Sequence, residues 1–478
     1  MVKTPELVDC MVLDLDATEV AQLIREKKLS SRQAVEIYIE QLNRINPAVN
    51  CLVENRFDEA LLEADNADRK LAAGEAAGLL FGVPISIKEA FDVDGMKTTG
   101  GLLRRKELVA NRDAEVVQKL RAEGGIILGK SNTPELCFCQ ETVNKLYGRT
   151  NNPRDLRRTA GGSSGGEGAL IAAGGAASGL GSDIGGSIRF PSHFNGVVGF
   201  KSGRGQVSPE GSYPEVKHEL QKRMLGIGPI AKSVRDARTL YNIVAKKQAP
   251  GRKLESFTFN IIPDTGYPLA DHTRKLLDSI FQKSSTNFET EREIPPYFTD
   301  SASIWQEIMS IDGAADSRYE AFGGKSMNLY SSYFKERMNR KSEVHQYLSW
   351  ALIGASLFKP SEKRLEKIQG FLQHGDHILE NYLKERILIM PVYHKTAPRH
   401  GVVYRELFSF RKTFRQYLPF VAFANTWGLP SLTVPVGWDE KGMPIGIQLI
   451  SRNGNEEALF QLGEWLEQNF QSYKRALL

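Results

Sequence analysis

The feature that most constrains the fold of this chain is a glycine- and serine-rich segment near its middle. Between residues 158 and 203 the chain holds fourteen glycines and seven serines in 46 residues. An excess of glycine often marks a flexible low-complexity stretch. This segment, however, contains apolar residues and no repeat, and its run 169–177 consists mostly of small residues. We therefore expect a tightly folded site in which backbone atoms approach one another closely.

Helix and strand patterns on both sides of this segment indicate a large α/β domain. Strands interspersed with helices on this scale favour a mixed sheet covered by helices on both faces. Helices are predicted at 16–44 (with a break at 29–31 and an end at Asn46-Pro47), 57–73, 114–122, 271–283, 361–383 and 456–469. Strands are predicted at 81–88, 126–128, 388–392 and 431–436, and the arginine-rich stretch 151–159 is expected to be a poor strand.

Composition and charge exclude several classes of protein. Hydrophobic residues make up 41% of the 478-residue chain and charged residues 25%, which is typical of a globular protein. The net charge of +5 is small and its charges are scattered, so we expect no nucleic-acid partner. Four cysteines, Cys10 among them, are too few for a disulfide framework, and we expect no metal and no cofactor. No apolar run approaches the ~20 residues of a membrane-spanning helix, and we predict a cytoplasmic protein.

One short motif offers nucleotide binding as an alternative function. Gly124-Gly-Ile-Ile-Leu-Gly129-Lys130-Ser131 matches the phosphate-loop pattern GxxxxGK[ST]. A phosphate loop lies between a strand and a helix, with the four intervening residues free to wrap the phosphates. Here three of those four residues are branched aliphatics typical of a strand, and a predicted helix precedes Gly124. The pattern therefore favours a buried strand.

A second motif offers the α/β-hydrolase mechanism. Gly161-Gly-Ser163-Ser-Gly165 matches GxSxG, the nucleophile elbow that needs a preceding strand, an acid and a histidine. The stretch before it is polar, and nothing in the sequence specifies either of the later histidines, His394 and His400, as the partner. We therefore disfavour this mechanism.

Three pieces taken together give a third interpretation. They are Gly82-Val-Pro-Ile-Ser-Ile-Lys88, Gly161-Gly-Ser163-Ser164-Gly165 and Asp183-Ile-Gly-Gly-Ser187. This constellation resembles the amidase signature family, and the intervals of 75 residues from Lys88 to Ser163 and 24 from Ser163 to Ser187 fit that family's triad. The resemblance covers most of the chain. It implies a single amidase domain over 1–478, with a catalytic core at 75–250 and a variable substrate-pocket region at 250–390.

The resemblance implies a Ser–cis-Ser–Lys triad in which Ser187 is the nucleophile, Lys88 the base and Ser163 the proton carrier, with a cis peptide bond before Ser163. Serine needs a base to become a good nucleophile. His193, the one histidine near the motifs, has no obvious acid partner, and we interpret it as structural. Lysine must be neutral to act, and burial lowers its pKa. Ser164 stays an alternative to Ser163.

The turn that ends at Ser187 also offers hydrogen-bond donors. We expect an oxyanion hole built from the backbone N–H groups of Ile184, Gly185, Gly186 and Ser187. A tight turn between strands would need the same glycines. We treat the flanking Asp183 and Arg189 as structural residues that orient the loop. Cys137 corresponds to a substrate contact in the family's pocket wall, although a buried apolar thiol is the alternative.

Two branches of the family differ in substrate. The form of the loop around Glu167 and the segment 390–401 resemble the fatty-acid amide hydrolase branch, which implies small-molecule amides, and esters, of hydrophobic acyl or aryl groups. The alternative is the glutamine-hydrolysing A subunit of an aminoacyl-tRNA amidotransferase, and a third is a catalytically silent binding protein. We see no integral membrane segment and predict a homodimer. Six aromatic residues are candidates for the acyl pocket: Trp305, Tyr319, Phe322, Phe334, Tyr347 and Trp350.

Overall fold

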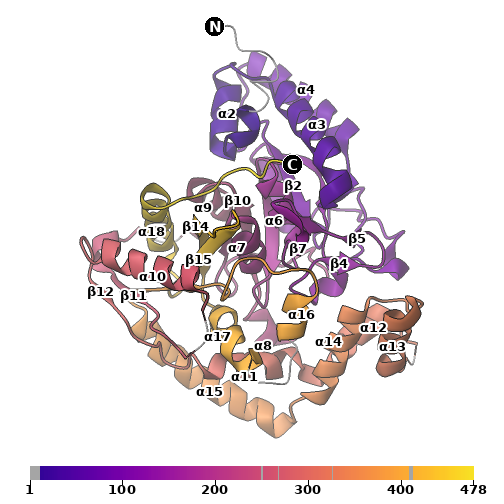
Figure 1. Ribbon diagram of the computed structural model, residues 1–478. Coiled ribbons are helices and arrows are strands. Elements are labelled where there is room, and N and C mark those ends of the chain that lie inside the picture. The colour runs from indigo at the N-terminus through magenta and orange to yellow at the C-terminus, as the bar shows by residue number, and fades with distance from the viewer. Residues whose placement is uncertain (1–10, 249–250, 267–268, 326, 408–412) are drawn as a thin grey trace.

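An eleven-stranded sheet runs through the molecule in the order β1-β3-β2-β8-β10-β9-β14-β15-β13-β11-β12. The computed structural model describes residues 11–248, 251–266, 269–325, 327–407 and 413–478 (Figure 1). The strands are β1 (Leu52–Asn55), β2 (Pro84–Lys88), β3 (Ile126–Ser131), β8 (Ser178–Asp183), β9 (Val198–Lys201), β10 (Gly226–Ala231), β11 (Thr258–Ile261), β12 (Thr290–Glu291), β13 (Arg386–Pro391), β14 (Ser431–Trp438) and β15 (Pro444–Ile450). Strands β3, β2 and β8 run parallel to one another, whereas β8 to β13 alternate in direction, so the sheet is mixed.

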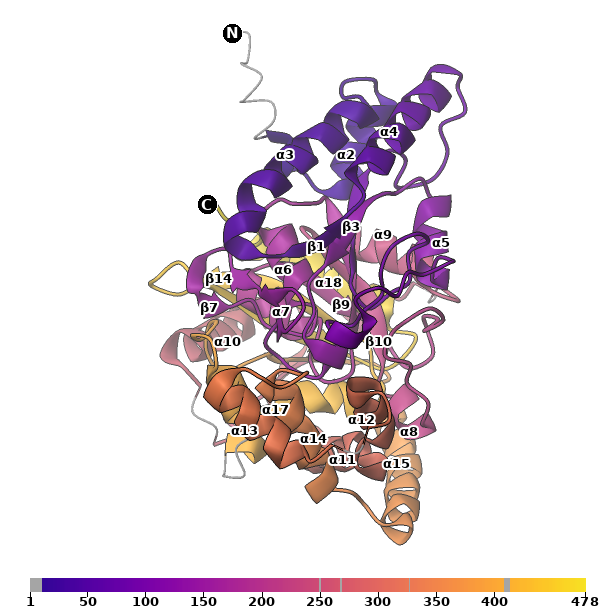
Figure 2. The same ribbon diagram turned by 90° about the vertical axis from the view of Figure 1, so that its right-hand side faces the viewer.

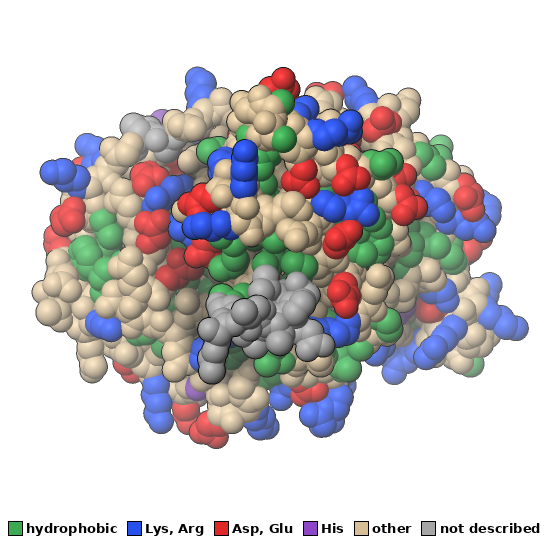
Figure 3. All heavy atoms as spheres, turned by 90° about the horizontal axis from the view of Figure 1, so that it is seen from above, with side chains coloured by type: hydrophobic (Ala, Val, Ile, Leu, Met, Phe, Trp, Pro, Cys, Tyr) green, Lys and Arg blue, Asp and Glu red, His purple; other side chains and the backbone are tan. Residues whose placement is uncertain are grey.

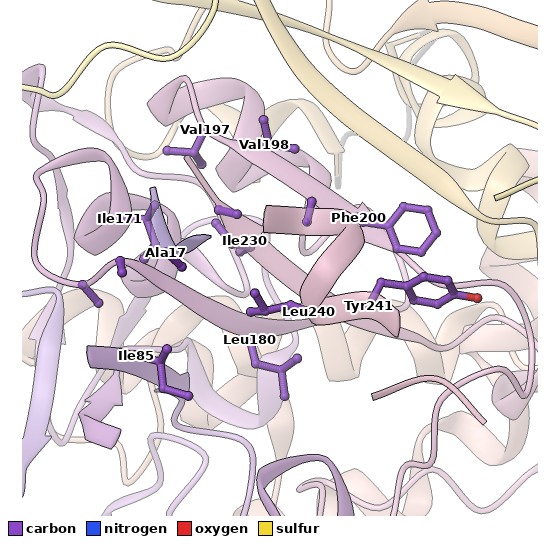
Figure 4. Close-up of a cluster of buried hydrophobic side chains, with 14 of the residues drawn as sticks. Ala17, Ile85, Ile171, Leu180, Val197, Val198, Phe200, Ile230, Leu240 and Tyr241 are labelled. Atoms are coloured by element: carbon purple, nitrogen blue, oxygen red, sulfur yellow. The ribbon is translucent and has the colours of Figure 1, made fainter. Parts of the chain in front are cut away.

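Helices pack on both faces of this sheet, as predicted. In β9, Phe200 lies with its ring centroid 4.6 Å from that of Tyr241 and 4.8 Å from that of Phe460, in α9 and α18 (Figure 4). The next residue back, Gly199, faces α7, where a Cβ would lie 2.0 Å from Ser192 Oγ. Because successive residues of a strand point to opposite faces, α9 and α18 cover one face and α7 the other.

Two groups of helices lie at opposite ends of the molecule. In both ribbon views α2 to α4 lie at one end and α11 to α15 at the other (Figures 1 and 2). The helices of eight residues or more are α2 (Ala17–Arg25), α3 (Ser31–Val49), α4 (Phe57–Ala72), α5 (Glu115–Ala122), α6 (Gly165–Ala172), α9 (Val234–Val244), α10 (Asp271–Ser284), α11 (Asp300–Met309), α12 (Ala315–Phe322), α13 (Leu329–Asn339), α14 (Gln346–Leu357), α15 (Glu362–Tyr382), α17 (Thr413–Thr426) and α18 (Glu456–Asn469). The shorter ones are α7 (Arg189–Asn195), α8 (Glu219–Lys222) and α16 (Val402–Leu407).

Most predicted elements are confirmed, but the prediction that a helix ends at Asn46-Pro47 is wrong. Helix α3 continues through Pro47 to Val49. The φ angle of proline fits a helix, and near the last turn only its own missing N–H bond is lost. Asn50 then caps the helix with φ of 53°, a left-handed conformation that asparagine tolerates.

The stretch that we expected to be a poor strand forms a small hairpin of its own. Strands β6 (Asn151–Asn152) and β7 (Asp155–Thr159) pair outside the main sheet. Asn152 Nδ2 donates to the carbonyl oxygens of Thr159, at 3.1 Å, and Phe194, at 2.8 Å. These bonds hold the hairpin against α7. The hairpin therefore forms without the alternating apolar residues by which a strand is recognised in a sequence.

The surface agrees with the scattered charges of the sequence. Basic and acidic side chains are interspersed over the face seen in Figure 3. Of the helices that the structure describes, none has the length and apolar character needed to cross a bilayer. Cys51, Cys137 and Cys139 are free thiols, and Cys10 lies outside the described residues.

Candidate active site

Lys88 is the last residue of β2 and lies at the centre of the site. Both neighbouring strands, β3 and β8, run parallel to β2, and every residue of β2 is buried. The Lys88 ammonium donates to Ser163 Oγ at 2.7 Å and to Ser182 Oγ at 3.0 Å. Burial lowers the pKa of Lys88 below that of an exposed lysine, although nearby acidic groups such as Asp183 act in the opposite direction. At a given pH, a larger fraction of Lys88 is therefore neutral than of a lysine exposed to water.

Ser163 lies in the turn between β7 and α6, and its hydroxyl is the group that Lys88 contacts at the shorter distance. The peptide bond between Gly162 and Ser163 is cis, as the resemblance implies. The neighbouring Ser164 is oriented differently, since its Oγ donates to the carbonyl oxygen of Ser182 at 3.4 Å and its N–H to that of Ser187 at 3.1 Å. The geometry favours Ser163 over Ser164 as the partner of Lys88.

Ser187 follows β8 and precedes α7. Its side chain lines the same cavity as Ser163 and Ser182. Among the described residues no hydrogen bond joins the hydroxyls of Ser163 and Ser187. Two of the three predicted residues, Ser163 and Ser187, thus line one cavity, and the buried Lys88 bonds directly to Ser163.

An ion pair beneath Ser187 fixes the shape of its loop. Asp183 and Arg189 are fully buried and form two hydrogen bonds of 3.0 Å. Burial opposes ionisation of Asp183, but the Arg189 charge outweighs it and holds the pKa of that carboxyl below its ordinary value. The carboxylate also accepts the N–H groups of Gly186, at 2.8 Å, and Ile188, at 3.1 Å.

The bond to Asp183 changes the predicted oxyanion hole. The Gly186 N–H, one of the four predicted donors, is already directed at a carboxylate. Within the described part of the chain, no group accepts a hydrogen bond from the N–H of Ile184, Gly185 or Ser187. These three amides therefore stay candidates for the oxyanion hole, and the sequence pattern alone had no means of separating them from Gly186.

The cavity in front of Ser187 has a volume of about 780 Å³ and lies between the catalytic core and the helices at one end of the molecule. Core residues that line it include Phe138, Gln140 and Tyr213. Trp305 of α11 and Trp350 of α14 line it from the helical side. Charged residues such as Lys217 and Asp316, which lie 3.3 Å apart and are largely exposed, also contribute to its wall.

Of the six aromatic candidates, only Trp305 and Trp350 line this cavity; the other four lie elsewhere. Tyr319 and Phe334 are 60% and 56% exposed. Phe322 is buried in an apolar cluster of which other members, such as Leu136 and Ile353, line the cavity, and Tyr347 stacks on Tyr404 with ring centroids 4.0 Å apart. The helical spacing of these residues does not reveal which face of each helix meets the core. Phe138 and Tyr213 lie in loops that carry no periodic signal.

Cys137 lines the cavity near Lys88. Its Sγ lies 3.3 Å from Thr133 Oγ1, and its backbone has φ of 58°. The thiol is only partly buried, so the alternative of a fully buried core thiol does not hold. Its contact with substrate stays a prediction.

Glu167 is a buried residue whose place in the site we missed. It lies in α6, where every residue is buried, and it accepts hydrogen bonds from the hydroxyls of Ser86 and Ser131. Burial raises the pKa of this carboxyl to about 7. The sequence does contain a sign of this role, since Glu167 is the single acidic residue in a helix of small and apolar residues.

The alternative motifs do not form the sites they suggest. Residues 126–131 form strand β3, and Lys130 is buried with its ammonium bonded to Thr98 Oγ1 at 2.9 Å, so no phosphate loop exists there.

His193 bonds backbone groups of Gly446 and Lys395, and burial lowers its pKa to about 4. In the described chain no histidine–acid pair lies at Ser163, and no cluster of potential ligands suits a metal ion.

Comparison with known proteins agrees with this geometry. The family model described as Amidase matches residues 33–460. The chain is 32% identical to fatty-acid amide hydrolase 2-B of Danio rerio, over 96% of this chain and 90% of that protein. It is 29% identical to the A subunit of a glutamyl-tRNA(Gln) amidotransferase of Clostridium acetobutylicum, over 95% of this chain and 99% of that protein. A crystal structure of an amidase superposes with a TM-score of 0.78 at 26% identity, over 95% of this chain and all of that one.

The fold and the matches together define a hydrolase that cleaves amide carbon–nitrogen bonds. The chain belongs to the amidase signature family. Its similarity to fatty-acid amide hydrolases supports a place in the branch that resembles those enzymes.

Proposed function

We propose that this amidase hydrolyses amides of hydrophobic acyl or aryl acids through Lys88, Ser163 and Ser187, by way of an acyl-enzyme. The observation that carries the proposal is the 2.7 Å hydrogen bond from the buried Lys88 ammonium to Ser163 Oγ. A buried lysine bonded to a serine hydroxyl at the rim of a cavity is an arrangement suited to proton transfer.

The reaction proceeds in two stages. Neutral Lys88 accepts the proton of Ser163 while Ser163 accepts that of Ser187, and Ser187 Oγ forms a bond to the carbonyl carbon of the amide. The N–H groups of Gly185 and Ser187 stabilise the negative oxygen. The carbon–nitrogen bond then breaks, and the departing nitrogen takes a proton back through Ser163. Water releases the acid from Ser187 by the same steps, with Lys88 again as base.

The missing hydrogen bond between Ser163 and Ser187 is compatible with this mechanism. Catalytic hydrogen bonds are often long or poorly aligned without substrate and tighten in the complex. Ser163 and Ser187 both line the cavity, so a bound amide would meet both hydroxyls.

The proposed substrate class rests on the cavity and on the relatives. Binding sites for small molecules are commonly several hundred Å³ in volume and mostly apolar, with a few polar groups that orient the ligand. Trp305, Trp350 and Phe138 supply apolar walls here, in a cavity of about 780 Å³. The similarity to fatty-acid amide hydrolase 2-B supports a hydrophobic acyl group, and esters of the same acids are expected as poorer substrates.

The amidotransferase A subunit is the second candidate, and the 29% identity to such a protein is the observation in its favour. Glutamine is small and polar, which fits the aromatic walls of this cavity less well. Glutaminase activity that appears only with co-purified partner chains would establish this alternative. A catalytically silent binding protein is the least favoured function, because Ser163 and Ser187 line the cavity and Lys88 bonds to Ser163, as the proposed chemistry requires.

A fluorophosphonate tests the nucleophile directly. This reagent forms a covalent bond to an activated serine, so intact-mass analysis should show one adduct on the protein and none on Ser187→Ala. An adduct that survives the substitution would refute the assignment. Turnover of an acyl-chain-length series of amides then tests the substrate class, and a preference for acetamide over long or aryl acyl groups would contradict it.

Two predictions concern the surroundings of the enzyme. The homodimer stays a prediction that light scattering of the purified protein can check. The cytoplasmic location likewise stays a prediction, which cell fractionation can check.

A further inference from the structure

Trp305 contacts the loop before Ser187 at two successive residues. Its indole Nε1–H donates to the carbonyl oxygen of Ile184 at 2.7 Å. The ring also packs on Gly185, where an added Cβ would lie 2.5 Å from Trp305 Cζ2. Trp305 belongs to α11, more than a hundred residues away in the sequence, so a helix outside the catalytic core determines how this loop sits.

The bond from Trp305 to the Ile184 carbonyl also determines the orientation of the peptide that joins Ile184 to Gly185. The Ile184–Gly185 peptide bond is not among the cis bonds of the described chain. In a planar trans peptide the C=O and the following N–H point in opposite directions. The Trp305 indole therefore fixes the direction of the Gly185 N–H, which is one of the unengaged donors of the loop that ends at Ser187.

A second anchor acts on the next peptide. Gln140 is buried, lines the cavity, and donates from Nε2 to the carbonyl oxygen of Gly185 at 3.2 Å. Since a carbonyl oxygen can only accept, this contact determines which end of the Gln140 amide carries the nitrogen. The following N–H, that of Gly186, points instead to Asp183 Oδ1 at 2.8 Å. Consecutive peptides of the loop are thus held in defined orientations by groups from different parts of the chain.

We propose that Trp305 is a positioning residue for catalysis: its indole N–H holds the Ile184–Gly185 peptide so that the Gly185 N–H faces the oxyanion formed when Ser187 attacks the amide. This inference rests on the proposed function. Trp305 also lines the cavity, so one side chain connects the wall of the substrate pocket to the donors that stabilise the reaction.

The proposal predicts that loss of the indole N–H of Trp305 lowers kcat much more than it changes KM. The variant Trp305→Phe keeps an aromatic wall but removes the indole N–H. Because the oxyanion exists only in the transition state, we expect kcat to fall about ten- to a hundredfold while KM changes less than about threefold. The inhibition constant of a trifluoromethyl ketone, whose serine adduct carries an oxyanion, should rise by about the same factor as kcat/KM falls. A rise in KM with unchanged kcat would overturn the proposal and leave Trp305 as a pocket wall only.

Trp427 provides a matched control. Its buried indole N–H donates to Ser301 Oγ at 3.0 Å, in the same helix α11, but Trp427 does not line the cavity. Trp427→Phe therefore removes the same kind of bond from α11 without touching the loop before Ser187. We expect it to lower the thermal midpoint and to leave kcat within about twofold. An equal fall of kcat in both variants would show a general effect of α11 and overturn the proposal.

Two further measurements keep the test decisive. If Trp305→Phe fails to fold, replacement of the indole by benzothiophene, which has nearly the same shape but no N–H, supplies the same comparison. Ser187→Ala separates this inference from the function on which it rests. If amide hydrolysis survives Ser187→Ala, the proposed function fails. If hydrolysis depends on Ser187 but kcat is insensitive to loss of the indole N–H, only the role of Trp305 fails.

Discussion

Glu167 and Lys88 are linked through the pair of strands that carries Lys88. Ser86, two residues before Lys88 in β2, donates to Glu167 Oε1, and Ser131, the register partner of Lys88 in β3, donates to Glu167 Oε2 at 2.5 Å. Residues i and i+2 of a strand share a face, so the carboxyl lies on the side of the sheet to which Lys88 points. A buried carboxyl and a buried amine thus lie in one environment.

This relationship predicts a pH effect of Glu167→Gln. Glu167 in its charged form favours protonated Lys88 and thereby raises the pKa of that amine against the lowering effect of burial. Activity requires neutral Lys88, so the acid limb of kcat/KM lies at the pKa of Lys88. Removing the charge should move that limb to lower pH. The measurement is a pH profile of kcat/KM for both proteins.

Other charged or titratable groups near Lys88, Cys137 and Asp183, stay in place in this variant. The control is Glu467→Gln, which removes a half-buried carboxyl on α18, whose pKa desolvation raises to about 8. It should leave the acid limb where it is. An acid limb that moves to higher pH, or not at all, in Glu167→Gln would contradict the prediction.

The two adjacent serines, Ser163 and Ser164, should respond differently to replacement by alanine. Ser163→Ala removes the nearer of the two hydroxyls that bond Lys88, and the one proposed to carry the proton of Ser187, so we expect kcat to fall by about a thousandfold or more. Ser164→Ala removes a bond of 3.4 Å to a backbone carbonyl and should cost less than about tenfold. Steady-state kinetics on one amide compares them, and equal losses would refute the choice of Ser163.

Replacing Lys88 by methionine should separate catalysis from folding. Lys88→Met keeps an unbranched side chain of similar length and removes a buried amine, so the thermal midpoint should stay within a few degrees. The same variant has no base, and we expect kcat to fall by about a thousandfold or more. Unchanged turnover would show that another group acts as the base. Circular dichroism and differential scanning calorimetry of the variant would test whether the fold is retained.

The sequence was sufficient for the parts of the site that short segments define. Lys88, Ser163 and Ser187 lie in glycine-rich turns and a buried strand whose spacing is readable along the chain. In the structure Ser163 and Ser187 line one cavity, and Lys88 bonds to Ser163. The mixed sheet with helices on both faces was also predicted, because strand and helix periodicities differ.

The sequence was insufficient where long-range contacts decide. Nothing local indicates that Trp305 reaches Ile184, or that Asp183 engages the Gly186 N–H and so removes it from the predicted oxyanion hole. The exposure of Tyr319 and Phe334 depends on which face of each helix meets the core, and their spacing is compatible with either outcome. Contacts across the fold, rather than local patterns, set these features.

Glu135 illustrates a further consequence of burial, this time for stability. Its carboxyl accepts the backbone N–H groups of Lys145, at 3.1 Å, and His345, at 2.8 Å, and so joins the core to the start of α14. Burial raises the pKa of Glu135 to about 8. In the unfolded chain a glutamate has a pKa of about 4.3.

The sign of the pH effect follows from these two values. A carboxyl whose pKa is raised on folding adds stability that is fully present below about pH 4.3 and is lost as the pH rises through about 8. Glu135→Gln is neutral throughout, so its thermal midpoint should fall less between pH 5 and pH 8 than that of the unmodified protein. Glu59→Gln, which changes an exposed glutamate in α4, should keep the full pH dependence. Calorimetry at both pH values makes the comparison, and identical falls in all three proteins would show that Glu135 is ionised at both pH values in the folded state.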